Sequence, residues 1–163
     1  MKSLKRSLDI KFGILRLAMA KVIIGADHGG FSKKEILKKW LLDKGVDVVD
    51  VGANSMENGD DFVDYAVAAV RQFSEGDRII LFCRNGFGMC MAVNRIKGMR
   101  CGIGYDEVAV YRGRVDDDIN ALSIPADYVS EESMIKIVEN FLRTNFSGDD
   151  KYQRRINKLD TLN

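Results

Sequence analysis

Short apolar runs alternate with amphipathic stretches along most of this chain. The first strong run, residues 21–26 (KVIIGA), is β-branched and ends in the turn-forming sequence DHGG, as expected of a buried strand that enters a loop. Four later runs share these features and predict strands at residues 46–51, 78–83, 100–104 and 120–125. The chain therefore supplies five candidate strands, each separated from the next by a longer segment.

The segments between the strands carry helical periodicity. The clearest stripe runs from Phe62 to Phe73, with apolar residues three and four positions apart. Before it, Leu37 and Leu41 share one helix face, and the lysines around them, Lys34 included, are expected on the solvent face. Further helices are predicted near residues 89–96 and 106–112, from residue 131 onward after the cap Ser130, and over residues 151–159. The last of these is basic.

Repeated strand–helix units of this length require right-handed crossovers and a parallel sheet covered on both faces. We therefore expect an α/β fold: one Rossmann-like three-layer domain with a five-stranded parallel sheet. This domain spans residues 21–163, including the basic C-terminal helix, and residues 1–20 form an N-terminal extension, with Met19 a candidate start. Open sheets of this kind bind ligands beyond the carboxyl ends of their strands, so residues 27–28 and 83–88 are expected on one edge.

Composition removes several classes of function. A formal net charge of +1 gives no broad basic field for nucleic acid, and no apolar run reaches the roughly 20 residues of a membrane span. Cys83, Cys90 and Cys101 form neither an even disulfide set nor paired C-x-x-C motifs. These thiols favour a reducing, cytoplasmic setting, and no metal site is expected.

Cys83 is the first candidate for chemistry, because it ends a strand and is followed by a glycine-bearing loop that opens a helix. The unpaired backbone N–H groups of a helix start stabilise a thiolate and can hold an oxyanion. The alternative is that Cys83 closes a buried strand, as cysteine often does. A phosphate-clamping arginine of Cys-dependent phosphatases would stand at Met89, and a third dinucleotide-binding glycine at Met91, so neither motif fits.

Three other sets of residues have both a functional and a structural interpretation. His28 is the single histidine and follows a predicted strand beside Asp27, where an α/β protein positions a substrate. The triplet 116–118 (DDD) is either functional or a solvated acidic loop. The basic residues Lys151 and Arg155 either capture a phosphate by charge-assisted hydrogen bonds or form a solvated helix face.

Four fragments, in order, carry a resemblance to a known family. GADHGG, CRNGFGMCMAVNRIKGMR, DDDINAL and KYQRRINKLD together resemble the B-type ribose-5-phosphate isomerase and galactose-6-phosphate isomerase family, and the likeness covers nearly all of residues 21–160. The resemblance implies a homodimer or a dimer of dimers. It also implies sites that straddle the subunit interface, a small sugar phosphate as the ligand, and no metal or organic cofactor.

The resemblance also implies roles for individual residues. Cys83 matches the general base that moves a proton between C1 and C2 of the sugar, and Asp27 matches a residue that orients the sugar. The remaining candidates are loop residues that stabilise the enediolate or residues that contact the ring or phosphate: Asn85, Gly86, Phe87, Gly88, His28, Asp117, Lys151 and Arg155.

The sequence departs from the family pattern at two carboxylates. Asp116 stands where many members carry the histidine that opens the sugar ring, and Asp127 stands where an arginine often contacts phosphate. We accordingly expect an aldose–ketose isomerase acting on ribose 5-phosphate and ribulose 5-phosphate, with Cys83, Asn85 and Asp116 as catalytic residues. Two alternatives stay open: a hexose 6-phosphate isomerase of the same family and a catalytically silent sugar-phosphate-binding relative.

Overall fold

The computed structural model describes residues 21–56 and 59–162 of the chain. Its centre is one parallel sheet of five strands in the order β2-β1-β3-β5-β4. The strands are β1 (Val22–Ala26), β2 (Val48–Asp50), β3 (Arg78–Cys83), β4 (Cys101–Ile103) and β5 (Ala121–Pro125). The α/β fold with five parallel strands is thereby confirmed, whereas the predicted extension, residues 1–20, lies outside the described residues.

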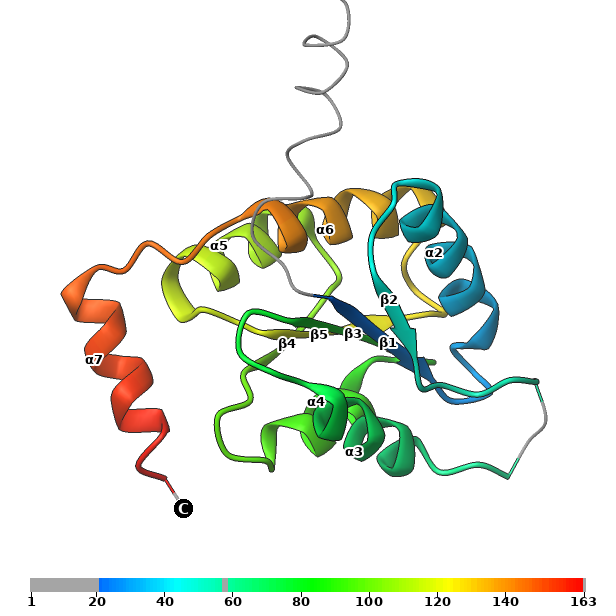
Figure 1. The fold of residues 1–163 in the computed structure, drawn as a ribbon, viewed down its shortest axis with the longest axis horizontal. Helices are drawn as coiled ribbons and strands as arrows, with labels where there is room; N and C mark the ends of the chain where they lie inside the picture. Colours follow the sequence, from blue (N-terminus) through cyan, green and yellow to red (C-terminus); the bar gives the residue numbers. More distant parts are fainter. Residues whose placement is uncertain (1–20, 57–58, 163) are drawn as a thin grey trace, which may run out of the picture.

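Helices cover both faces of the sheet (Figure 1). One layer holds α2 (Phe31–Asp43), α5 (Glu107–Asp117) and α6 (Glu131–Arg143), and the other holds α3 (Phe62–Gln72) and α4 (Phe87–Asn94). Each face of the sheet has its own apolar cluster, one around Phe82 and Phe141 and the other around Leu81 and Met89. The alternation of side chains along β3 sends Leu81 and Phe82 to opposite layers, so this strand anchors both cores.

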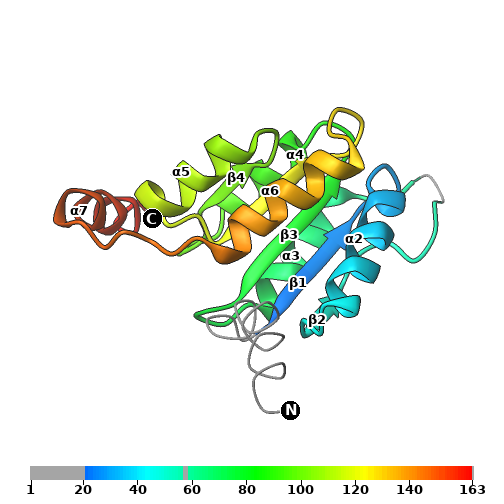
Figure 2. The ribbon, with the colours of Figure 1, turned by 90° about the horizontal axis from the view of Figure 1, so that it is seen from above.

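The last helix, α7 (Asp150–Leu159), stands apart from the two layers (Figures 1 and 2). It contacts the rest of the chain through α5, and Ile156 is its buried residue. Within the described ranges, no helix is long and apolar enough to cross a membrane.

Two local expectations were wrong. Lys34 is fully buried instead of solvent-exposed, and its ammonium binds the carboxylate of Asp50 at the end of β2. The helix predicted at residues 106–112 continues to Asp117, so Asp116 and Asp117 lie in its last turn. The triplet is therefore not a solvated acidic loop.

Candidate active site

The register of the sheet brings two predicted site segments together. Ala26 of β1 pairs with Phe82 of β3, so the next residues, Asp27 and Cys83, leave neighbouring strands at the same edge. The backbone N–H of Asp27 donates to the carbonyl of Phe82 at 3.4 Å. This carboxyl edge of the sheet is where open α/β sheets hold their ligands.

Cys83 is a free thiol, 5% exposed, at the last position of β3. The chain turns sharply after it through Gly86, whose φ of +79° favours glycine, and α4 begins at the next residue. Ser123 of β5 fixes this turn, because its hydroxyl donates to the carbonyl of Gly86 at 2.6 Å. The thiol is thus buried and lies close to the start of α4, where a hydrogen bond from Ser123 fixes the turn.

Asn85 and the start of α4 supply hydrogen-bond donors beside this thiol. The Oδ1 of Asn85 accepts from the backbone N–H of Phe87 at 3.0 Å, so the amide Nδ2 stays available to donate outward. Phe87 is 59% exposed and Gly88 is partly buried. The Nδ2 group of Asn85 and the backbone N–H groups that follow Phe87 in α4 are therefore of the type that stabilises a developing oxyanion.

Asp27 and His28 form the second wall of this edge. Partial burial raises the pKa of Asp27, although the backbone N–H of Gly30, at 3.0 Å from Oδ1, opposes that rise. His28 is oriented by Asp60, which accepts from the His28 backbone N–H at 2.9 Å and lies 2.5 Å from the ring Nδ1. With Nδ1 committed to Asp60, the Nε2 atom of His28 is left for another partner.

Asp60 is a residue of this edge that the sequence reasoning missed. Partial burial opposes ionisation, but hydrogen bonds from the ring and backbone of His28 and from the hydroxyl of Tyr65 hold its pKa below the usual range. Its only sequence signal was a pair of aspartates before the helical stripe, a pattern equally typical of a helix cap.

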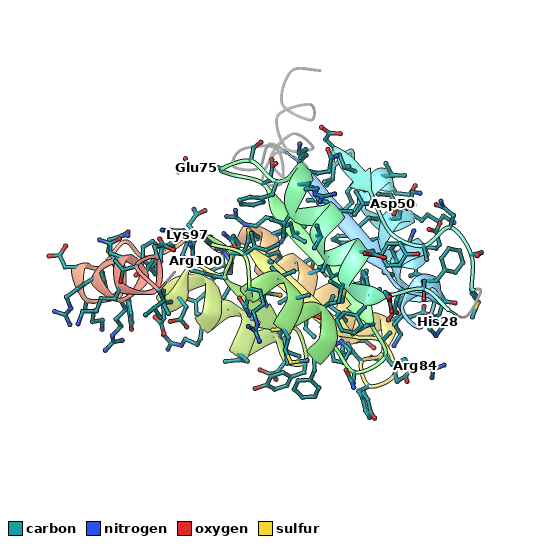
Figure 3. All side chains as sticks on the ribbon, turned by 90° about the horizontal axis from the view of Figure 1, so that it is seen from below. His28, Asp50, Glu75, Arg84, Lys97 and Arg100 are labelled. Atoms are coloured by element: carbon teal, nitrogen blue, oxygen red, sulfur yellow. The ribbon has the colours of Figure 1, made fainter. Side chains whose placement is uncertain are left out.

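The remaining candidates lie elsewhere. Asp116 and Asp117 end α5 at the amino edge of the sheet, beside Asp118, whose carboxylate binds Arg100 and Arg114 at 2.8 Å each. A cavity of about 520 Å³ between this edge and α7 is lined in part by Asp117. Figure 3 shows Arg100 at this side of the molecule, well away from His28 and Arg84.

Lys151 and Arg155 lie one turn apart on α7 and are both exposed. Their charged groups flank the ring of Tyr152, at 4.4 Å and 5.6 Å from its centroid. Two cations held on one helix side suit a phosphate. However, α7 is not packed against the carboxyl edge, so a single chain does not bring Lys151, Arg155, Asp116 or Asp117 to Cys83.

Among the described residues, no group of three or more histidine, cysteine, aspartate or glutamate side chains is arranged to hold a metal ion.

Comparisons with known proteins agree with this geometry. Residues 22–159 match the model of the Ribose/Galactose Isomerase family. The chain is 36% identical over 141 residues to the probable ribose-5-phosphate isomerase B of Mycoplasma genitalium, covering 85% of this chain and 92% of that relative.

Solved structures show the same likeness. A ribose 5-phosphate isomerase of Thermotoga maritima is 36% identical with a TM-score of 0.83, covering 87% of this chain and 98% of that one. The Mycoplasma genitalium ribose-5-phosphate isomerase B with bound ribulose-5-phosphate is 36% identical with a TM-score of 0.82, covering 87% and 95%. The resemblance read from the four sequence fragments is confirmed, and this chain belongs to the ribose/galactose isomerase family.

Proposed function

We propose that this protein interconverts the aldose and ketose forms of a phosphorylated sugar, first of all ribose 5-phosphate and ribulose 5-phosphate. The observation that carries the proposal is Cys83, a buried free thiol at the carboxyl end of β3, between Asp27 and the start of α4. The similarity to a structure that holds ribulose-5-phosphate supports the choice of sugar.

In this mechanism Cys83 is the base that moves one proton. Its thiolate takes the proton from C2 of the open aldose, and the electron pair forms the C1–C2 double bond of a cis-enediolate while the carbonyl oxygen gains the charge. A proton then passes from the O2 hydroxyl to O1. The thiol returns its proton to C1 while the C2–O bond becomes the carbonyl of the ketose. Because Cys83 is 5% exposed, little water competes for the proton during the transfer.

The donors beside Cys83 stabilise the intermediate. The enediolate oxygen accepts from the Nδ2 group of Asn85 and from backbone N–H groups at the start of α4. Asp27, fixed by Gly30, accepts from sugar hydroxyls and so orients the chain of carbon atoms.

Ribose 5-phosphate is largely cyclic, so a group that exchanges a proton with the ring oxygen is also needed. The resemblance assigns this task to the position of Asp116, which in one chain lies at the far edge of the sheet. His28, which lies at the same edge as Cys83, is the alternative, because Asp60 leaves its Nε2 free. The two candidates can be separated by substitution.

We further propose that the working form is a homodimer or a dimer of dimers in which each site uses residues of two chains. Within one chain, none of four candidate residues lies near Cys83: Asp116, Asp117, Lys151 and Arg155. A second copy of the chain would bring its own copies of these residues to that thiol. The position of α7, away from its own domain and carrying exposed cations, supports this arrangement. Lys151 and Arg155 would then hold the substrate phosphate by charge-assisted hydrogen bonds.

The proposal is tested by assaying the purified protein on a panel of four-, five- and six-carbon sugar phosphates. We expect the highest kcat/KM on ribose 5-phosphate. A clear preference for a hexose 6-phosphate would favour the alternative substrate. Binding without turnover, measured by calorimetry, would identify a catalytically silent relative.

A cytoplasmic location goes with this function, since the three cysteines are free and free thiols persist in reducing compartments. Cell fractionation with an antibody against the chain tests this location.

A further inference from the structure

Cys90 and Cys101 lie against each other outside the proposed catalytic group. Cys90 is in the first half of α4 and Cys101 is the first residue of β4. The Sγ atom of Cys90 donates to the carbonyl oxygen of Cys101 at 3.3 Å, and Cys90 packs against the apolar cluster to which Cys101 belongs. Because the Cys90 sulfur contacts the backbone of Cys101, rotation of the two side chains is the movement that a bond between their sulfurs requires.

Asn94 fixes this arrangement from one turn further along α4. Its Oδ1 accepts from the backbone N–H of Cys101 at 2.7 Å, and its Nδ2 donates to the carbonyl of Cys101 at 2.9 Å. The same Nδ2 lies 3.5 Å from the Sγ of Cys90. Because Asn94 binds both cysteine residues, it holds this part of α4 against β4 and keeps Cys90 and Cys101 next to each other.

The two thiols are unequal. Cys90 is partly exposed, whereas Cys101 is only 8% exposed. The hydrogen bond from Cys101 outweighs partial burial and, with Asn94, lowers the pKa of Cys90 to about 7. The same pairing, together with burial, raises the pKa of Cys101. Cys90 is thus the more exposed and the more readily ionised of the two thiols, so an oxidant is expected to react with Cys90 before Cys101.

We propose that Cys90 and Cys101 are a redox-reactive pair that forms a reversible intramolecular disulfide on exposure to a peroxide, before Cys83 is oxidised. The Cys90 thiolate attacks one peroxide oxygen, the O–O bond breaks, and a sulfenic acid and hydroxide form. The Cys101 sulfur then attacks the Cys90 sulfur, the S–S bond forms, the S–O bond breaks and water leaves. The net reaction turns two thiols and one peroxide into one disulfide and two waters, and a small dithiol reverses it by exchange.

This reaction would act close to the proposed active site without using its residues. The backbone N–H of Cys90 donates to the carbonyl of Gly86 at 3.3 Å, closing the first turn of α4. A bond between Cys90 and Cys101 would tie that turn to β4. The pair itself depends on no substrate, so the proposal stands or falls independently of the sugar.

The test uses wild-type protein, because the sequence places each cysteine in a separate tryptic fragment. These fragments are residues 79–84 with Cys83, 85–95 with Cys90 and 101–112 with Cys101. After limited treatment with hydrogen peroxide and capping of remaining thiols, we expect the second and third fragments to be joined, with the loss of two hydrogen atoms in mass. Free thiols should fall from the three cysteines of the chain to the one in residues 79–84, and dithiothreitol should restore all of them.

Two variants complete the design. Cys101→Ser should abolish the linkage and leave Cys90 as the oxidised residue, whereas Cys83→Ala should leave the linkage unchanged. A disulfide that includes Cys83, a bond between two chains, or oxidation of Cys83 at the lowest peroxide dose would overturn the proposal. Because the linkage is mapped in the wild-type chain, the test does not depend on either variant folding.

Discussion

Arg84 and Asp127 are joined across the carboxyl edge of the sheet by a side-chain and a backbone contact. A guanidinium nitrogen of Arg84 lies 3.4 Å from a carboxylate oxygen of Asp127, and the backbone N–H of Asp127 donates to the carbonyl of Arg84 at 3.0 Å. The methylenes of Arg84 lie so close to Gly29 that a Cβ there would come within 2.6 Å of them. The carboxylate at position 127, where the resemblance suggests an arginine, is thus paired with a cation from the loop after Cys83.

This pairing predicts a dependence of substrate binding on both residues. Arg84→Gln should raise the KM for a sugar phosphate about tenfold, because an unpaired Asp127 would repel the phosphate dianion. Arg84→Gln/Asp127→Asn should recover most of that loss, since the repelling charge is removed as well. Steady-state kinetics on the two variants and on Asp127→Asn complete the cycle. A double variant no better than Arg84→Gln would instead mean that Arg84 contacts the phosphate itself.

A site shared between subunits predicts complementation between inactive variants. Cys83→Ala should be inactive, and Lys151→Ala/Arg155→Ala should be impaired in phosphate binding. Mixed after unfolding and refolding together, the two should regain up to about a quarter of wild-type activity, because half of the dimers are hybrids and each hybrid holds one intact site. Co-refolding each variant with itself is the matched control. Recovery no greater than in those controls would place each site within one chain.

Asp116 and His28 can be distinguished as the ring-opening group. An ionised carboxylate is a poor proton donor at neutral pH, so Asp116→His should raise turnover of a cyclising pentose phosphate and Asp116→Asn should lower it. His28→Asn should have the larger effect if His28 opens the ring. No change in rate for either Asp116 variant, on any sugar phosphate of the panel, would reduce Asp116 to a helix-end residue.

The ion pair between Asp50 and Lys34 lies outside the proposed active site, and we expect it to contribute to the stability of the fold. Lys34 is fully buried, and Asp50→Asn would leave its ammonium with Glu35 as its remaining carboxylate partner, costing about 2 kcal/mol of unfolding free energy. Burial disfavours ionised Asp50, but hydrogen bonds from Lys34, Lys38 and Gly52 hold its pKa below the usual 3.8. That stabilisation is complete above the unfolded pKa and is lost as the pH falls through the lower folded value.

Urea unfolding of wild type and Asp50→Asn at neutral and at acid pH measures this effect. The gap between the two proteins should narrow in acid, since protonated Asp50 resembles asparagine. Glu132→Gln, which breaks the exposed pair with Lys136, is the control and should change stability little at either pH. An equal gap at both pH values would show that the charge of Asp50 is not what stabilises the fold.

The strands of the sheet could be predicted from the sequence because each strand is marked by a local run of apolar residues. Buried parallel strands are continuous apolar runs, and the run that ends at Cys83 is visible without any long-range information. Burial of Lys34 was not predictable in this way, because it depends on Asp50, which the fold brings to it from the following strand. The orientation of His28 by Asp60 likewise joins residues that are 32 positions apart.

The site was predicted in part for the same reason. Asp27 and Cys83 follow strands whose carboxyl ends meet, so the rule for parallel sheets was enough to place them together. Predicting that Asp116 lies far from Cys83 would have required the full length of α5. This helix runs to Asp117 and so places Asp116 at the amino edge of the sheet. No local sequence pattern predicts how far Asp116 lies from Cys83.

The central claim is that the thiol of Cys83 moves the proton between C2 and C1, and deuterium transfer tests it most directly. With ribose 5-phosphate that carries deuterium at C2, in ordinary water, the wild-type protein should form ribulose 5-phosphate that carries the transferred deuterium at C1. Cys83→Ala should fold and still bind the sugar phosphate, yet lose at least about 10²-fold in both turnover and deuterium transfer, while Cys90→Ser keeps both. Turnover with deuterium transfer near the wild-type level in Cys83→Ala would contradict the account and require another base.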